Sequence, residues 1–461
     1  MIRRPSLPVP AQLSQQLTHR YKQLATPEST IGRAVEHARS PMFFTAYALI
    51  LNQVISAGMG MVYWFIAARM FPDALVGRNA VVISQLALIS FLAQFSLQAA
   101  MVRFMPTVGR AARRFVINAY VISFISCGVC GAAALLGQRW LNPTNTILNF
   151  DLTQSLYWVL IMAVWGIFTV QEGVLIGLRK PIWVLVQYVL YNGAKIGLLF
   201  AFVQQNQGGQ NAQPYSLFMS WTLAVPVIVL LINWVIFKHL LPDQMARTAD
   251  VAPPIASQVR KFVFGDFLGV LFSETTFRAL PTLILYRLLN DSAYSADRAN
   301  AYFNQSMLLT MPLFLIASNM AASLTVTAAA YPDKLEEYGR RMIKQMARLL
   351  VPFALVLAVA VPYILGIYGA AYATEGTLLM RLLLVSVIPA ILNIWYIGYA
   401  RAKNRLLWMV LNQALLCVLV LSLSYILLPR LGVTGVGVAW LIAQSIVAVS
   451  VALRIFRKHS S

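Results

Sequence analysis

Long apolar windows, each of about 20 residues, dominate this sequence and limit what it can fold into. A helix of that length crosses the hydrocarbon layer of a bilayer, where the backbone must satisfy its own hydrogen bonds. The sequence therefore predicts an all-α polytopic membrane protein with about twelve transmembrane helices. The windows lie at about residues 43–68, 80–101, 115–136, 155–178, 181–203, 216–237, 262–285, 299–330, 349–368, 377–399, 406–428 and 433–455.

Composition agrees with a chain that folds in lipid. Only 11% of the residues are charged, against roughly 25% in soluble domains. The N-terminal residues hold no apolar stretch followed by a small-residue cleavage site, so we expect no cleavable signal peptide. Leu13, Leu17, Tyr21 and Leu24 recur there at helical spacing. Two interpretations of this segment stay open, a helix on the cytoplasmic membrane surface and a disordered tail.

The placement of basic residues predicts the orientation. With the N-terminus inside, 27 of the 36 Lys and Arg residues fall in cytoplasmic segments and 6 in outer loops. Such an asymmetry places both termini in the cytoplasm. It also explains most of the net charge of +21 as topology. Nucleic acid is not an expected partner, because the basic residues form no single patch.

The longest internal polar segment divides the spans into two sets of six. We predict a cytoplasmic tail at 1–42, six-helix bundles at 43–237 and 262–455, a cytoplasmic linker at 238–261 and a short cytoplasmic tail at 456–461. An even number of helices per half predicts parallel repeats about an axis along the membrane normal. A weak sequence repeat between the two halves is consistent with this, in which an Ile-Gly pair and a basic turn are followed by a Trp and a Gln. It occurs as Ile176, Gly177, Trp183 and Gln187, and again as Ile397, Gly398, Trp408 and Gln413.

Charged residues inside spans are costly and usually mark a pathway or a partner. Lys195 lies too deep in its span to reach the interface, so it either lines a central cavity or has a structural partner. Glu274 and Arg278 are four residues apart and share one helical face, where they can form an ion pair. Ligand contact by Arg278 is the alternative interpretation.

Three further charged residues within spans are weaker candidates for a functional site. Asp266 and Arg381 each lie about one turn inside a helix end and can reach the interface as anchors. Glu172, beside Gln171, is a candidate for a proton or cation site. Cys127 and Cys130 have C-x-x-C spacing in the middle of a span, where small packing residues are the better interpretation.

The first two spans carry a motif made of Ala68-Arg69, Pro72, Gly77 and the exit Arg103-Phe104-Met105-Pro106. With this motif they resemble polysaccharide flippases of the MATE-like (MOP exporter) superfamily. The stretches ANAYFNQSMLLTMPLFLIASNMAASLT, IYGAAYATEGTLLMRLLLVSVIPAIL with RAKNR, and LPRLGVTGVGVAWLIAQSIV are similar to later spans of that group. The sequence departs where the family has glycine before the proline, here Phe71, and where it favours Gly-Tyr, here Ala301-Tyr302.

The resemblance implies two six-helix bundles around a central cavity that opens alternately to each side. It also implies a bacterial plasma (inner) membrane protein that translocates an undecaprenyl-diphosphate-linked oligosaccharide for cell-surface polysaccharide synthesis, of the O-antigen or lipopolysaccharide type. Other polysaccharide-assembly proteins and membrane lipids are the implied partners. No catalytic residue, cofactor or metal is expected.

Buried cations suit a diphosphate because charge-assisted hydrogen bonds compensate its desolvation. Lys195, Arg278 and Arg381 are therefore the predicted diphosphate-binding residues. Glu172, Asp266 and Glu274 are candidates for coupling to H⁺ or Na⁺, and they carry the alternative function, a proton- or sodium-coupled multidrug exporter. A membrane polymerase or ligase is disfavoured, because the longest outer loop, about 137–154, is too short for a catalytic domain.

Overall fold

The computed structural model describes residues 41–141, 150–205, 214–248, 254–289, 295–330, 335–403 and 405–459. Within these ranges the chain is helical and contains no strand. Eleven helices are long and apolar enough to cross a membrane, or twelve spans if one bent pair of helices counts as one. The predicted all-α polytopic fold is confirmed. The surface helix considered for the N-terminal tail lies outside the described residues.

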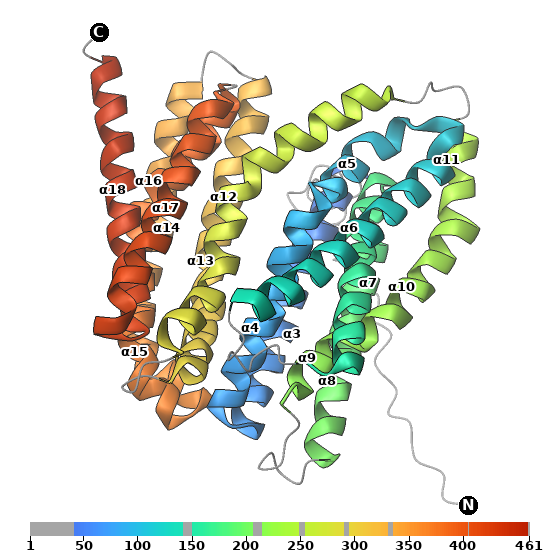
Figure 1. Cartoon of the computed structure of the whole chain (residues 1–461). Helices are drawn as coiled ribbons and strands as arrows, with labels where there is room; N and C mark the ends of the chain where they lie inside the picture. Colours follow the sequence, from blue (N-terminus) through green and yellow to red (C-terminus); the bar gives the residue numbers. More distant parts are fainter. Residues whose placement is uncertain are drawn as a thin grey trace, which may run out of the picture.

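The helices fall into two groups in chain order, labelled as in Figure 1. The first group comprises α3 (Pro41–Met70), α4 (Asp73–Gln94), α5 (Leu97–Phe104), η1 (Met105–Thr107), η2 (Gly109–Ala111), α6 (Ala112–Leu141), α7 (Leu152–Gly177), α8 (Pro181–Gln205), α9 (Ser216–Thr222), α10 (Ala224–Val235), the π-helix η3 (Ile236–Leu240) and α11 (Leu241–Arg247). The second comprises α12 (Ala256–Leu288), α13 (Ala296–Ala330), α14 (Leu335–Tyr368), α15 (Ala370–Val385), α16 (Val387–Ala402), α17 (Leu406–Leu431) and α18 (Thr434–His459).

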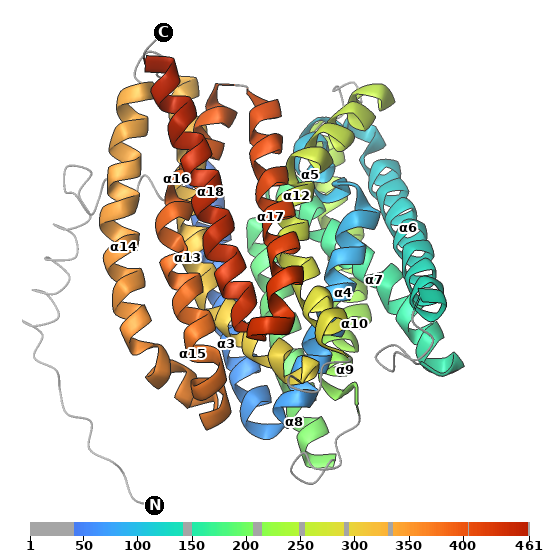
Figure 2. The ribbon, with the colours of Figure 1, turned by 60° about the vertical axis from the view of Figure 1, so that its left-hand side comes forward.

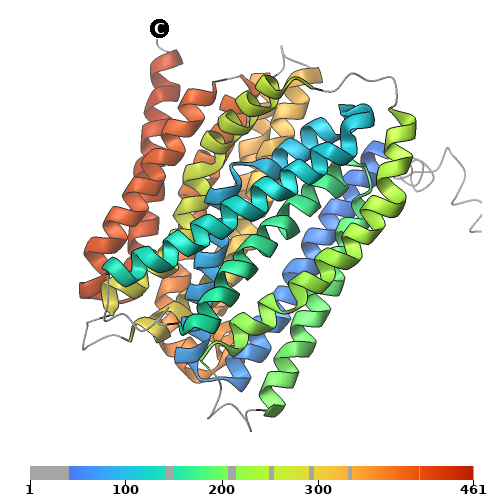
Figure 3. The ribbon, with the colours of Figure 1, turned by 45° about the vertical axis from the view of Figure 1, so that its right-hand side comes forward.

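Each group packs mainly within itself. In the first, α6 packs on α7 and α3 packs on α8, and in the second, α14 packs on α15 and α17 packs on α18. Figure 2 places α6 and α14 at opposite edges of the molecule. Figure 3 shows the blue-to-green helices on one side and the orange and red ones on the other. The main contacts between the groups run from α4 to α13 and α12.

Two expected spans are interrupted. Phe95 and Ser96 adopt left-handed backbone angles, with φ of 46° and 59°, which ends α4 inside the window expected at 80–101. Ser386 separates α15 from α16, and the two helices meet at a bend of 42°. Hydropathy could not predict these breaks, because it measures apolar content and not backbone direction.

The expected linker at 238–261 is largely helical where the structure describes it. The π-helix η3 and α11 continue the sixth span as far as Arg247, and α12 begins at Ala256. The polar residues of this segment therefore extend helices beyond the apolar windows. Polar composition ends a hydropathy window without ending the helix.

Prolines inside helices leave carbonyl groups that need another donor. A proline has no N–H, so the carbonyl four residues earlier loses its helical hydrogen bond. Pro362 lies inside α14, and Arg381 of α15 donates from Nε to the freed carbonyl of Ala358 at 3.0 Å. Pro429 lies inside α17, and Arg287 of α12 donates in the same way to Tyr425 at 3.0 Å.

We predict that Arg381→Met lowers the stability of the protein in detergent by about 1–3 kcal/mol, because the Ala358 carbonyl then lacks a donor. Pro362→Ala returns an N–H to that carbonyl, so Arg381→Met should cost clearly less in the Pro362→Ala background. Thermal unfolding of the wild type, both single variants and the double variant measures this coupling. Equal costs in both backgrounds would contradict a role for Arg381 as the partner of this carbonyl.

Candidate functional site

Four charges and one tyrosine join the two groups where α4 and α13 begin. Arg78 pairs with Asp297 at 3.1 Å, and Arg298 pairs with Asp73 at 3.5 Å. Tyr302 donates to the Asp73 carboxylate at 2.8 Å. Each group supplies one acid and one base, so the pairing is reciprocal. We call these five residues the charged junction.

Backbone contacts close the same end of the molecule. A side chain at Gly77 would overlap the backbone carbonyl of Asp297, so α4 can approach α13 this closely only with glycine there. Arg69 at the end of α3 donates to the carbonyl of Ile367 in α14 at 2.7 Å. This end is therefore held by contacts between two helices of the first group, α3 and α4, and two of the second, α13 and α14.

One face of α12 packs along α4, from the polar start of α12 toward the middle of the fold. Phe267 packs against Phe91 and Phe95, with ring centroids 6.0 and 5.2 Å apart. Glu274 and Arg278 lie seven and eleven residues further on, which places them on the same helical face. The Arg278 guanidinium lies 5.9 Å from the centroid of the Phe91 ring. The pair therefore lies between the two groups of helices.

The Glu274–Arg278 ion pair is neither buried nor fully exposed. The guanidinium meets the carboxylate at 2.8 Å, as the four-residue spacing predicts, and the side chains of Arg278 and Glu274 are 37% and 40% exposed. Intramembrane charges normally face a bundle interior. Because both side chains are partly exposed, a bound group could contact either of them. Asp266, the other acid of α12, is half-buried two turns nearer the start of the helix.

Glu172 lies inside the first group. Its carboxylate accepts a hydrogen bond from the Tyr188 hydroxyl at 2.8 Å, which links α7 to α8. Gln171 beside it is fully buried and donates to the carbonyl of Val229 in α10. Both side chains thus have partners within their own group of helices. Coupling to a proton or a cation at Glu172 stays a prediction.

Lys195 of α8 is surrounded by aromatic rings. Its side chain is buried, and Nζ lies 4.1 Å from the ring centroid of Trp221, 4.8 Å from Tyr63 and 5.2 Å from Tyr191. A desolvated cation over an aromatic face gains about 2 kcal/mol or more. Among the described ion pairs none includes Lys195. We call the three residues Tyr63, Tyr191 and Trp221 the aromatic cage.

The three predicted diphosphate-binding residues lie in different places. Lys195 is inside the first group, Arg278 lies between the groups, and Arg381 joins α15 to α14 on an exposed face. Among the described contacts, none connects any two of them. Their shared role in binding therefore stays a prediction.

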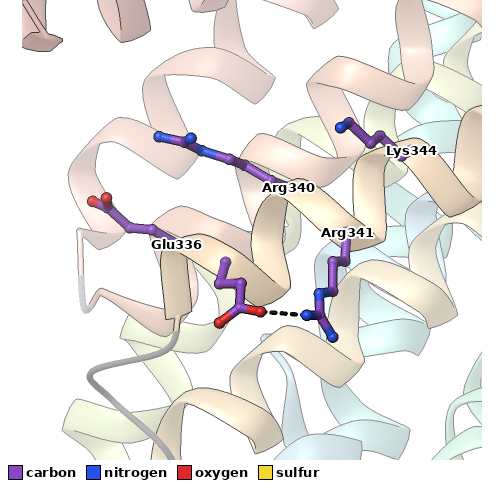
Figure 4. Close-up of a pocket in the computed structure, with 5 residues that line it drawn as sticks. Glu336, Arg340, Arg341 and Lys344 are labelled. Atoms are coloured by element: carbon purple, nitrogen blue, oxygen red, sulfur yellow. Dashed lines mark ion pairs between the residues drawn. The ribbon is translucent and has the colours of Figure 1, made fainter.

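A shallow pocket of about 260 Å³ lies at the start of α14 (Figure 4). It is lined by Glu336, Glu337, Arg340, Arg341 and Lys344. Glu337 pairs with Arg341, and Lys403 from the end of α16 pairs with Glu336 at 3.3 Å. A hydrogen bond with Tyr399 raises the pKa of Lys403, and Glu336 acts in the same direction.

Sequence reasoning missed the aromatic cage and the charged junction. Tyr191 and Lys195 have i, i+4 spacing, which signals a contact on one helix face. Tyr63 and Trp221 are too distant in the sequence to be assigned to Lys195 by spacing. The four charges of the junction lie between expected spans, where their alternating signs are consistent with pairing but do not identify the partners.

No protein-family model and no curated protein matches the sequence. Among solved structures, the chain is similar to a multidrug resistance MATE family transporter of the MOP superfamily. The inward-facing conformation gives a TM-score of 0.70 at 16% identity, covering 90% of this chain and 99% of that one. The outward-facing conformation gives 0.56 at 16% identity, covering 91% and 94%.

A MOP superfamily transporter from Pyrococcus furiosus is also similar, with a TM-score of 0.56 at 15% identity and coverage of 91% and 94%. For that transporter, the reverse polarity of its binding pocket suggests a different function. Together these matches show that the chain has the fold of MATE-like transporters of the MOP superfamily.

We predict that Arg78→Asp opens the charged junction, because it places a carboxylate opposite Asp297. A repulsion of about 1 kcal/mol changes the open fraction roughly fivefold. Spin labels at Met70 and Ser295, in a protein whose three cysteines are replaced by alanine, should then report a longer distance. Exchanging both charges, as Arg78→Asp with Asp297→Arg, should restore the wild-type distance. An unchanged distance in Arg78→Asp would show that the junction does not hold the two groups together.

Proposed function

We propose that this protein is a flippase that moves an undecaprenyl-diphosphate-linked oligosaccharide across the bacterial inner membrane for cell-surface polysaccharide synthesis. The two groups of helices move against each other, and the space between them opens alternately to each side. The reaction is transport and needs no catalytic residue. The proposal rests first on Arg278, a half-exposed cation between the groups.

Arg278 has the chemistry and the position to bind a diphosphate. A guanidinium donates two parallel hydrogen bonds to phosphate oxygens, and such charge-assisted bonds are about twice as strong as neutral ones. Its surroundings, Phe91 on α4 and Glu274 on its own helix, leave part of the group accessible. A carboxylate alone in this position would favour a cationic substrate instead.

Glu274 plays the part of an exchangeable counter-ion. In the empty protein it neutralises Arg278 and so reduces the cost of placing a charge between helices. A diphosphate carries more negative charge than one carboxylate and competes for the same guanidinium. Binding therefore exchanges one anion for another and leaves no cation unpaired at any step.

Lys195 supports an anionic substrate through its field. It adds a positive charge to the first group without a described carboxylate partner, and low dielectric surroundings extend its influence. Direct contact with the diphosphate would require the aromatic cage to open, because only 2% of Lys195 is exposed in this conformation. Arg381 is the weaker third candidate, since its guanidinium already holds the Ala358 carbonyl.

The proposed orientation places the charged junction at the outer side. The basic starts of α12 and α14 then face the cytoplasm, as the distribution of Lys and Arg favours. The higher TM-score to an inward-facing transporter than to an outward-facing one, 0.70 against 0.56, supports this assignment. An inside-negative potential helps, because each negative charge moved outward gains about 2.3 kcal/mol per 100 mV.

A proton- or sodium-coupled multidrug exporter is the second candidate. It is favoured by the partly buried Glu172–Tyr188 contact, since an intramembrane carboxyl group can carry a coupling proton. The similar solved structures include a multidrug transporter, and folds of this kind accept different chemistries. The two candidates differ in the sign of charge that the substrate carries.

We predict that Arg278→Gln slows flipping of a fluorescent undecaprenyl-diphosphate oligosaccharide in proteoliposomes by about 10- to 100-fold. The loss corresponds to one or two charge-assisted hydrogen bonds. Arg260→Gln is the matched control, because Arg260 is an exposed arginine near the start of the same helix. It should keep the wild-type rate. Equal rates for both variants would remove Arg278 from the binding site.

The rival function makes a different prediction. If the protein exports cationic drugs, proton-driven efflux of a cationic dye should occur in wild-type proteoliposomes and fall strongly in Glu172→Gln, since the amide cannot exchange a proton. We expect no such efflux. Dye efflux that depends on Glu172, together with no flipping of the glycolipid, would replace the flippase proposal with the exporter.

A further inference from the structure

We propose that the aromatic cage is a site for a monovalent ammonium-type cation, and that the chain's own Lys195 occupies it. The first group of helices thus carries its own tethered cation. The inference depends on the geometry of the cage alone. It stands whether or not the transported substrate is a glycolipid.

The cage has the geometry of an ammonium site. Its three ring centroids lie between 4.1 and 5.2 Å from Nζ, all inside the range of about 6 Å over which a ring attracts a cation. The rings come from α3, α8 and α9, so they surround the ammonium from three helices. Aromatic cages of this kind recognise ammonium ligands in other proteins.

Other lysines near aromatic rings in the described residues lack such a cage. Lys238 lies over Trp234 alone, and Lys403 lies over Tyr399 alone. Lys403 also pairs with Glu336, so its charge has an acidic partner. Of the lysines that the structure describes, Lys195 alone combines a buried side chain with three rings and no described ion pair.

The walls of the cage are held by contacts that do not involve Lys195. The Tyr63 hydroxyl lies 2.7 Å from the Ser220 hydroxyl oxygen. Trp221 packs edge-on against Tyr63 and Tyr191 and is stacked near Trp165, with centroids 6.5 Å apart. Removing the lysine side chain should therefore leave a preformed space. A preformed site binds a small ligand without the cost of ordering its walls.

The ammonium group in the cage is covalently attached to the chain through the Lys195 side chain, which has a physical advantage over a free cation. A covalently attached ammonium has a high effective concentration at its own site and does not depend on dissolved ions. The packing of α3, α8 and α9 around a positive charge then persists in any salt. Free Na⁺ or K⁺ is not needed to complete this part of the protein.

The test uses Lys195→Ala with n-propylammonium, which supplies the three carbons and the ammonium group that the substitution removes. We expect the purified full-length variant to have a lower Tm than the wild type and to regain stability with propylammonium. A ligand of four heavy atoms should act with a Kd on the order of 1 mM. Uncharged 1-propanol should restore nothing, and the wild type should not respond to either compound.

Two further variants separate charge from volume. Lys195→Met fills nearly the same space without charge, so it should be less stable than the wild type and insensitive to propylammonium. Trp221→Leu in the Lys195→Ala background should abolish the response, because it removes the ring that is nearest to Nζ. If Lys195→Ala does not fold alone, expression with propylammonium should recover it.

Three results would overturn the inference. Wild-type stability of Lys195→Met would show that the charge is not what the cage holds. Equal stabilisation of Lys195→Ala by propanol and propylammonium would indicate simple cavity filling. A Lys195→Ala protein that is not stabilised, or not recovered, by propylammonium would mean that the cage does not bind ammonium. All readouts are binding or stability measurements, so they stay independent of the glycolipid assay.

Discussion

The cost of leaving a charge or an unpaired polar group in hydrocarbon determines most of the distinctive side-chain geometry in this protein. The chain meets this cost in three ways. Arg278 has a carboxylate four residues away on its own helix, and Lys195 has aromatic faces. Arg287 and Arg381 meet the cost in another way, because their guanidinium groups donate hydrogen bonds to carbonyls that prolines leave without donors. Lys195, Arg287 and Arg381 are thereby occupied, whereas Arg278 stays partly exposed beside Glu274.

The same interactions divide into those that hold one group of helices together and those that join the two groups. The aromatic cage and the Glu172–Tyr188 contact lie inside the first group, and the bonds from Arg287 and Arg381 to carbonyls freed by prolines lie inside the second. The charged junction, in contrast, consists of partly exposed ion pairs, which contribute little individually. Two internally well-connected bodies that are joined in part by individually weak ion pairs can move as units, as the proposed alternating access requires.

The sequence predicted features that depend on local composition. The spans follow from apolar length, and the Glu274–Arg278 pair follows from spacing on one helix. Gly177 and Gly398, which belong to the weak sequence repeat, both lie where one helix crosses another at close range. Gly177 lies against the backbone of Met101, and Gly398 lies against that of Ala321. A small residue recurs at these positions because only it allows that approach.

Features that depend on the meeting of distant segments could not be predicted. Tyr63 and Trp221 reach Lys195 only because α3 and α9 pack beside α8. Arg381 appeared to be an anchor or a ligand-binding residue because the partner that it actually has, a carbonyl freed by Pro362, is invisible to a scan for opposite charge. Breaks at Ser96 and Ser386 were missed for a related reason, since neither changes the apolar content of its window.

The pairing of Arg278 with Glu274 bears on how the proposed flippase would release its substrate. An unpaired guanidinium in a low-dielectric space would bind a diphosphate tightly and release it slowly, whereas transport requires binding that is weak enough to reverse. An internal carboxylate lowers the net gain on binding, because the substrate must replace it. It also offers the guanidinium a partner when the substrate departs. A carboxylate beside the cation therefore does not argue against an anionic substrate, because the pair can make binding of that substrate reversible.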